Sequence, residues 1–147
     1  MRFETYSLAR VKINGKYGFI NAKGEMVIPA KFDDVEHYFF NGLTRVKING
    51  RYGFINAKGE MVIPARFDFA LDFAANGLAA VKEGDKWGYV NAEGEMVIPA
   101  RFEYAYDFHT DGLARVKEEG KYGYINGKGE IVIPAWFEDT NIFYPVE

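Results

Sequence analysis

Apolar and polar residues alternate through residues 8–13, and the same alternation returns every 35 residues along the chain. Ala9, Val11 and Ile13 fall on one side of an extended backbone, and Arg10 and Lys12 fall on the other. An alternation with a period of two is typical of a half-buried β-strand. We therefore predict a first strand over residues 8–13 of the first copy and at the equivalent positions of each later copy.

A second strand is predicted over residues 16–21, separated from the first by Asn14-Gly15. Asn-Gly is the preferred pair for a two-residue type I′ turn, because both positions need a positive φ. The first two strands of a copy therefore form a tight hairpin. The pair becomes Gly84-Asp85 in the third copy and Glu119-Gly120 in the fourth.

A third strand follows the turn at residues 21–24, which has the order of a type I turn closed by a left-handed glycine. We predict this strand over residues 25–28, ended by Pro29 because proline has no amide donor. The second and third strands carry large apolar side chains on both faces, including Ile20 and Val27. We therefore expect neighbouring copies to cover both faces of each meander.

The remaining part of each copy is a linker of less uniform sequence, in which no helix beyond a turn or two is expected. An aromatic residue returns six positions after the linker phenylalanine of every copy, and we expect these residues to pack between copies. They are Tyr38, Phe73, Phe108 and Phe143.

The repeat divides the chain into four copies, residues 8–42, 43–77, 78–112 and 113–147, after a cap of residues 1–7. Between residues 11–33 and 46–68, 21 of 23 positions are identical. We predict a single all-β domain over residues 1–147, built of antiparallel meanders stacked in an open superhelical array. The alternative is a closed four-bladed propeller. A sequence this regular is also what an engineered scaffold without a natural ligand would have.

The recurring segment Gly15–Pro29, and residues 85–91 followed by Gly94 and Val97-Ile98-Pro99, resemble the bacterial WG repeat. The resemblance covers nearly the whole chain and implies a β-repeat architecture and interaction functions, with no catalytic residues to carry over. Tryptophan itself stands only at position 87. The signature pairs of aromatic residue and glycine are Tyr17-Gly18, Tyr52-Gly53, Trp87-Gly88 and Tyr122-Gly123.

Composition narrows the function classes. The 147 residues have a net charge of −3 and no cysteine, which leaves no disulfide, thiolate metal site or cysteine nucleophile. No apolar run reaches the roughly 20 residues needed to cross a bilayer, and the first residues lack the apolar stretch of a secretory signal. We therefore expect a soluble, cytoplasmic chain that binds neither membrane nor nucleic acid.

Charge is distributed unevenly among the copies. Counting Lys, Arg, Asp and Glu gives +1, +2, −4 and −2 from the first copy to the fourth. Opposite charge on the two halves would favour head-to-tail attraction between molecules, so self-association is one expectation.

Catalytic chemistry finds little support in the sequence. The only serine is Ser7, outside the regular repeat, and the histidines His37 and His109 occupy different repeat offsets. Acidic residues recur after each turn glycine and after each linker phenylalanine, where bonding to turn and linker amides is the simplest use. We expect no enzyme activity, no metal and no cofactor.

Variation concentrates in the linkers, so we expect a non-catalytic binding or scaffolding module whose linkers contact a protein partner. A carbohydrate ligand held on a row formed by Tyr17, Tyr52, Trp87 and Tyr122 is the alternative. The candidate binding residues are His37, Tyr38, Phe39, Phe69, Asp72, Tyr104, Tyr106 and His109.

Overall fold

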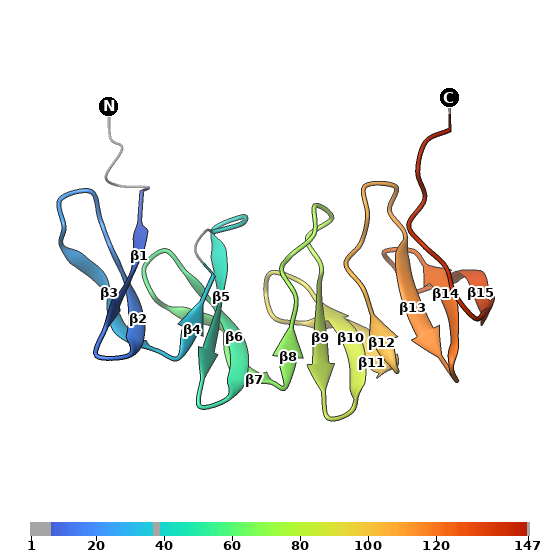
Figure 1. Cartoon of the computed structure of the whole chain (residues 1–147), viewed down its shortest axis with the longest axis horizontal. Coiled ribbons are helices and arrows are strands. Elements are labelled where there is room, and N and C mark those ends of the chain that lie inside the picture. Colours follow the sequence, from blue (N-terminus) through green and yellow to red (C-terminus); the bar gives the residue numbers. More distant parts are fainter. Residues whose placement is uncertain (1–6, 37–38, 147) are drawn as a thin grey trace. The chain divides into compact units, whose positions relative to one another are not determined.

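The computed structural model describes residues 7–36 and 39–146, and all regular secondary structure in this part of the chain is β-strand (Figure 1). The chain divides into two compact units, residues 1–68 and 69–147, each of which contains two antiparallel sheets. Each unit is described by itself below.

The first unit begins with a three-stranded sheet in the order β1-β2-β3, formed by Ala9–Ile13, Lys16–Ile20 and Met26–Phe32. Its second sheet has the order β4-β5-β6-β7, formed by Asp34–Val35, Leu43–Ile48, Arg51–Asn56 and Met61–Phe67. Neighbouring strands of both sheets are antiparallel, as the meander prediction requires.

The second unit repeats the four-stranded arrangement twice. One sheet consists of β8 to β11, which are Phe69–Ala70, Ala79–Glu83, Lys86–Val90 and Met96–Phe102. The other consists of β12 to β15, which are Tyr104–Ala105, Ala114–Glu118, Lys121–Ile125 and Ile131–Phe137. The prediction of an all-β fold of tandem meanders is confirmed, and consecutive meanders stack on one another within each unit.

The linkers contribute a strand that the alternation did not predict. β4 belongs to the first copy by sequence but pairs with β5 of the second, where Val35 lies opposite Val46 (Figure 1). β12 joins the third copy to the fourth in the same way, with Ala105 opposite Val116. Each four-stranded sheet is therefore assembled from two copies of the repeat, and the backbone hydrogen bonds tie one copy to the next.

The hairpin turns have the geometry predicted for them in three copies. Asn14 and Gly15 have φ values of 51° and 81°, and the Glu119-Gly120 turn of the fourth copy follows with 49° and 79°. In the third copy only Gly84 has a positive φ, 68°, and Asp85 does not. A single positive φ at the first position is the requirement of a type II′ turn, which also suits a tight hairpin.

The expectation that Pro29 ends the third strand is wrong, because β3 continues to Phe32. Phe19 pairs with Ile28 and Tyr17 with Phe32, so a bulge absorbs the extra residues around Pro29. Proline is tolerated at a bulge, where its missing amide is not needed for the ladder.

The signature glycine lies directly against this bulge. A Cβ atom on Gly18 would lie 2.5 Å from the Ile28 carbonyl oxygen and 2.7 Å from the Ala30 nitrogen. A Cβ atom on each of the other signature glycines would also lie 2.5 Å from the equivalent carbonyl oxygen. These distances leave no room for a side chain, which explains why glycine recurs at this position.

The core of the first unit joins its two copies. It is formed by the buried side chains Phe19, Ile28, Phe32, Val35, Val46 and Ile55. The core of the second unit contains Trp87, Tyr89, Ile98, Phe102, Phe108 and Ile125 among others, again from two successive copies.

The prediction that both faces of each meander are covered is wrong at the start of the third strand. Met26 and Val27 are 44% and 39% exposed, whereas Ile28 is fully buried. The bulge changes the alternation, so that Ile28 and Phe32 are buried, Ala30 is half-buried and the other residues of the strand are exposed.

Burial of the predicted aromatic packing residues is confirmed at Phe73 and Phe108, which are 8% and 6% exposed. The ring of Phe108 lies 4.9 Å from that of Tyr89, within the same copy. Tyr38 lies outside the described residues, and the neighbouring Phe39 contacts Phe19 at 5.2 Å. The ring contact of Phe108 thus lies inside a copy, whereas a contact between copies was expected, and the predicted packing residue Phe143 is 48% exposed.

No helix in the described ranges has the length and apolar character needed to span a membrane.

Candidate functional site

The candidate binding residues predicted from the linkers lie in different surroundings. His37 and Tyr38 lie outside the described residues. Phe39 is half-buried against the core of the first unit. In the second unit, Phe69 is 38% exposed with its ring 6.0 Å from that of Trp87, and Asp72 is half-buried.

Tyr104 and Tyr106 lie together in the second unit. Their ring centroids are 4.7 Å apart, and the ring of Tyr104 also lies 4.7 Å from that of Trp87. Tyr106, which follows β12, forms a hydrogen bond with Tyr122 of β14, on the far side of β13. Burial, followed by this hydrogen bond, raises the pKa of Tyr106 above its usual 10.0.

The signature aromatic residues occupy two kinds of environment. Tyr122 is half-buried, with the Arg115 guanidinium 5.4 Å and the Lys117 ammonium 5.6 Å from its ring centroid. Tyr17 and Tyr52 have the equivalent arginine and lysine over their rings. Cations attracted to a ring face leave mainly the ring edge and hydroxyl open to a ligand.

The third copy differs because Ala80 stands where the other copies have this arginine. Trp87 fills the space and is only 3% exposed, covered by Tyr104 and Phe69. The predicted row of four exposed aromatic residues is therefore interrupted, and Trp87 cannot present a ring face to a sugar.

An open groove of about 520 Å³ lies in front of the tyrosines. We call it the tyrosine groove. Its lining residues are Asp85, Lys86, Glu103, Tyr104, Tyr106, Lys117 and Tyr122. Asp85 and Lys86 come from the β9–β10 hairpin, and the others from β12, β13, β14 and the residues directly before and after β12. The groove thus runs across two successive sheets of the second unit.

A second open pocket of about 470 Å³ shares Lys86 and Glu103 with the groove. Its remaining lining residues are Arg101, Glu118, Glu119, Lys121 and Ala135. Side chains of both charge signs therefore continue along the surface beyond the tyrosines, which enlarges the area available to a partner.

His109 lies apart from the groove, on a smaller pocket of about 40 Å³ lined also by Tyr106, Tyr124 and Phe143. That volume holds a few water molecules at most. His109 is exposed and lies within 3.4 Å of the Thr110 hydroxyl oxygen.

The recurring carboxylates have local structural partners. Glu25 accepts a hydrogen bond from the Asn21 side chain at 2.8 Å, and the same Asn–Glu pair is present in the turns of the three later copies. Glu103 accepts from the Gly120 amide at 2.8 Å, and Asp33 from the Asn49 amide at 2.8 Å. Among the described residues, no three histidine or acidic side chains lie close enough to hold a metal ion.

Sequence reasoning found two of the groove residues as binding candidates, Tyr104 and Tyr106, and assigned Tyr122 to the repeat signature and to the alternative sugar-binding row. It missed Asp85, Lys86, Glu103 and Lys117. The available signal was weak: the third copy alone has Gly-Asp in its hairpin turn, and an acid follows every linker phenylalanine.

Comparison with known proteins identifies the repeat. A family model described as "WG containing repeat" matches four consecutive segments, residues 17–52, 52–87, 87–122 and 122–144. The match spans most of the chain in steps of 35 residues. A search of curated proteins finds no match.

Proposed function

Because this chain belongs to the WG repeat family, we propose that it is a non-catalytic interaction module whose tyrosine groove binds a segment of another protein. The observation that carries the proposal is the groove itself, in which three tyrosines meet side chains of both charge signs on an open surface. Tyrosine is enriched at protein interfaces because one residue offers apolar area and a hydrogen-bonding hydroxyl.

The chemistry of the groove favours a peptide segment over a sugar. Sugar platforms need an open aromatic face, but the ring of Tyr106 has the Arg115 guanidinium 4.0 Å from its centroid. The accessible groups are ring edges, hydroxyls and the charges of Asp85, Lys86 and Lys117. These groups match the backbone amides, carbonyls and mixed side chains of an extended polypeptide.

The carboxylates near the groove support a binding role without catalysis. Glu103 holds the hairpin turn of the next copy through the Gly120 amide, which commits it to a structural hydrogen bond. The interaction surface is therefore best understood as a rigid platform built on sheet strands.

Selection of a random peptide library displayed on phage against the purified chain tests the proposal. A synthetic copy of a selected peptide should shift the amide resonances of Lys86, Lys117 and Tyr122 in a titration followed by NMR. Tyr104→Ala should weaken peptide binding about tenfold, which is about 1.4 kcal/mol.

The matched control is Phe69→Ala. Phe69 occupies the same repeat offset as Tyr104 and contacts the same Trp87, but it does not line the groove. We expect this variant to keep the affinity within about twofold. An equal loss of peptide affinity in the two variants would overturn the proposal. So would the finding that no peptide binds while a glycan array gives hits.

A further inference from the structure

Successive copies inside each unit are joined by the same set of contacts. In the first unit, Asp34 of β4 lies opposite Lys47 of β5, and the Asp33 carboxylate accepts from the Asn49 amide in the next hairpin turn. In the second unit, Tyr104 lies opposite Lys117, and Glu103 accepts from the Gly120 amide. The linker of one copy therefore always binds the first hairpin of the next.

The apolar part of this junction is also repeated. Ile28 is fully buried, and a Cβ atom on Gly59 would lie 3.2 Å from the Ile28 side chain. Ile98 is fully buried in the same way, 3.2 Å from the Cβ position of Gly129. The turn glycine of one copy thus lies on the inward isoleucine of the copy before it.

The fourth copy presents this junction surface uncovered. Phe137 is 43% exposed, whereas the equivalent Phe32 and Phe102 are fully buried. Ile133 is half-buried where Ile28 and Ile98 have no exposed area. An apolar surface that is covered wherever another copy follows is left open on β15.

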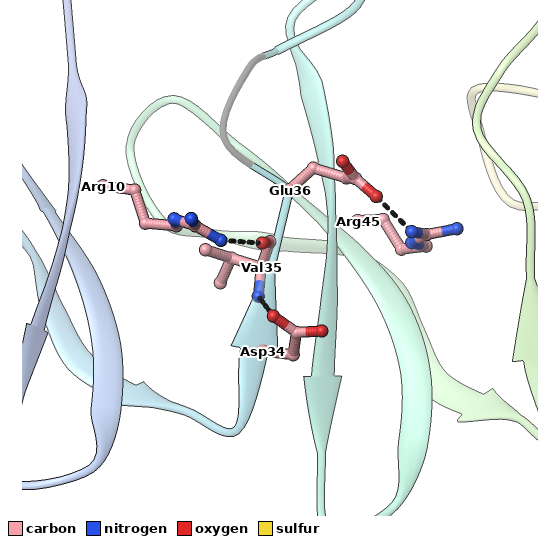
Figure 2. Close-up of polar contacts among 5 residues, drawn as sticks. All are labelled: Arg10, Asp34, Val35, Glu36 and Arg45. Atoms are coloured by element: carbon pink, nitrogen blue, oxygen red, sulfur yellow. Dashed lines mark hydrogen bonds and ion pairs between the residues drawn. The ribbon is translucent and has the colours of Figure 1, made fainter.

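The linker after β15 is already held as it is in the first copy. The Arg115 guanidinium donates to the Thr140 carbonyl at 2.6 Å, as Arg10 donates to the Val35 carbonyl at 3.2 Å. Figure 2 shows this Arg10 contact on β4, together with the Arg45–Glu36 ion pair just beyond it. Residues 139–140 are therefore positioned like β4 but lie in no ladder among the described residues.

The first copy presents the complementary surface. β1 lies at the edge of the one sheet that, in the described residues, has three strands instead of four. Ile13 is 46% exposed, and Ile20 is half-buried where the equivalent Ile55 and Ile125 are fully buried. Gly24 has nothing within 4 Å of its Cβ position, unlike Gly59 and Gly129.

We propose that the fourth copy of one molecule docks on the first copy of a second molecule through this same junction. The 35-residue step fixes the register, with Asp139 opposite Lys12 and Thr140 opposite Val11 of the second molecule. The Glu138 carboxylate of the first molecule then accepts a hydrogen bond from an amide of the Asn14-Gly15 turn of the second, and Ile133 packs on Gly24 of the second molecule. This proposal does not depend on the function proposed for the groove.

Charge complementarity supports a second copy as the occupant. The docking linker carries Glu138 and Asp139, and β1 presents Arg10 and Lys12 on its exposed side. The two surfaces differ, so the contact is head-to-tail and leaves one surface of each kind free on every open assembly. The expected products are dimers and longer chains that shorten as salt rises.

Sedimentation velocity over a concentration series at low salt tests the proposal. The chain should form species larger than the monomer, in proportions that rise with concentration. Gly24→Asn should weaken association at least about tenfold, because a side chain there meets the incoming Ile133. Asparagine tolerates the φ of +82° at this position. Gly112→Asn is the control, since Gly112 also has a positive φ and open space.

A charge exchange checks the register. Lys12→Glu and Asp139→Lys should each weaken association several-fold, because like charges then lie opposite each other. The chain with both changes should recover most of the association.

Three outcomes would overturn the proposal. The first is a monomer at every concentration, and the second is association that Gly24→Asn leaves unchanged. The third is a change in sedimentation on Gly24→Asn that is the same at every concentration, which would place the contact within one molecule. Circular dichroism of each variant confirms that it is folded, and Tyr104→Ala should associate like the unchanged chain. Loss of peptide binding and loss of association are therefore separate results.

Discussion

The glycine after each signature aromatic residue is determined by a backbone contact. It faces the bulge at the Ile-Pro-Ala segment of the third strand, at distances that exclude a Cβ atom. The aromatic residue before it has more freedom, since Tyr with a neighbouring arginine and Trp87 with Ala80 fill the same slot. Glycine is therefore the more restricted half of the signature.

Substitution of a signature glycine should cost far more stability than substitution of another glycine in the same copy. We expect Gly123→Ala to lower the free energy of unfolding by more than about 2 kcal/mol, since its Cβ would lie 2.5 Å from the Ile133 carbonyl oxygen. Urea unfolding followed by circular dichroism measures the change.

Gly127→Ala is the matched control. The nearest atom to its Cβ position is the Asn76 side-chain nitrogen at 3.7 Å, and the other copies have alanine at this offset. We expect a gain of about 0.5 kcal/mol from the less flexible unfolded chain. Similar losses in the two variants would contradict the bulge explanation.

At the scale of elements, the linker is both a connection and a strand. The alternation predicted the hairpin strands and their turns well, because period-two patterns and Asn-Gly pairs report local backbone preferences. It could not predict β4, β8 and β12, which are two residues long and exist only because a following copy offers its edge. The prediction that Pro29 ends the third strand failed because the bulge that accommodates this proline depends on the facing Gly18, which is distant in the sequence pattern.

The linker acid should make the first unit sensitive to low pH. The Lys16 hydrogen bond, followed by that of the Asn49 amide, holds the pKa of Asp33 below its usual 3.8. A lowered folded pKa contributes stability above the unfolded value, and that stability is lost as pH falls through the folded value. The stability of the first unit should therefore fall as pH drops below 3.8.

Asp33→Asn should remove this part of the acid sensitivity, and Lys16→Met should reduce it, because Lys16 is its main cause. Chemical denaturation monitored by the amide resonances of β4 and β5 at a series of acidic pH values measures both effects. An unchanged pH profile in Asp33→Asn would show that the linker acid does not contribute.

At the scale of the whole molecule, equivalent residues differ in burial according to their place in the array. Val11 of β1 is half-buried, whereas Val81 and Val116, at the same offset, are 0% and 1% exposed. Phe137 and Phe102 show the same contrast on the third strand. A copy is thus completed by its neighbours, as expected of repeat proteins.

Hydrogen exchange should reveal this difference in burial between the first copy and the later ones. In dilute solution at moderate salt, we expect the amides of β1 to exchange about a hundredfold faster than those of β9 and β13. Among the described residues β1 is an edge strand with exposed side chains, whereas β9 and β13 are interior strands with mostly buried or half-buried ones. NMR-detected exchange measures the rates, and equal protection in the three strands would contradict the prediction.

The amino-acid sequence by itself determined the period, the hairpins, the turn glycines and the family of this protein. These features depend on local backbone preferences and on side-chain alternation, which the chain carries residue by residue. Tertiary structure alone decided the linker strands, the burial of Trp87 and the gathering of Tyr104, Tyr106 and Tyr122 around one groove. Those features require residues from two copies to meet, and no local pattern encodes that meeting.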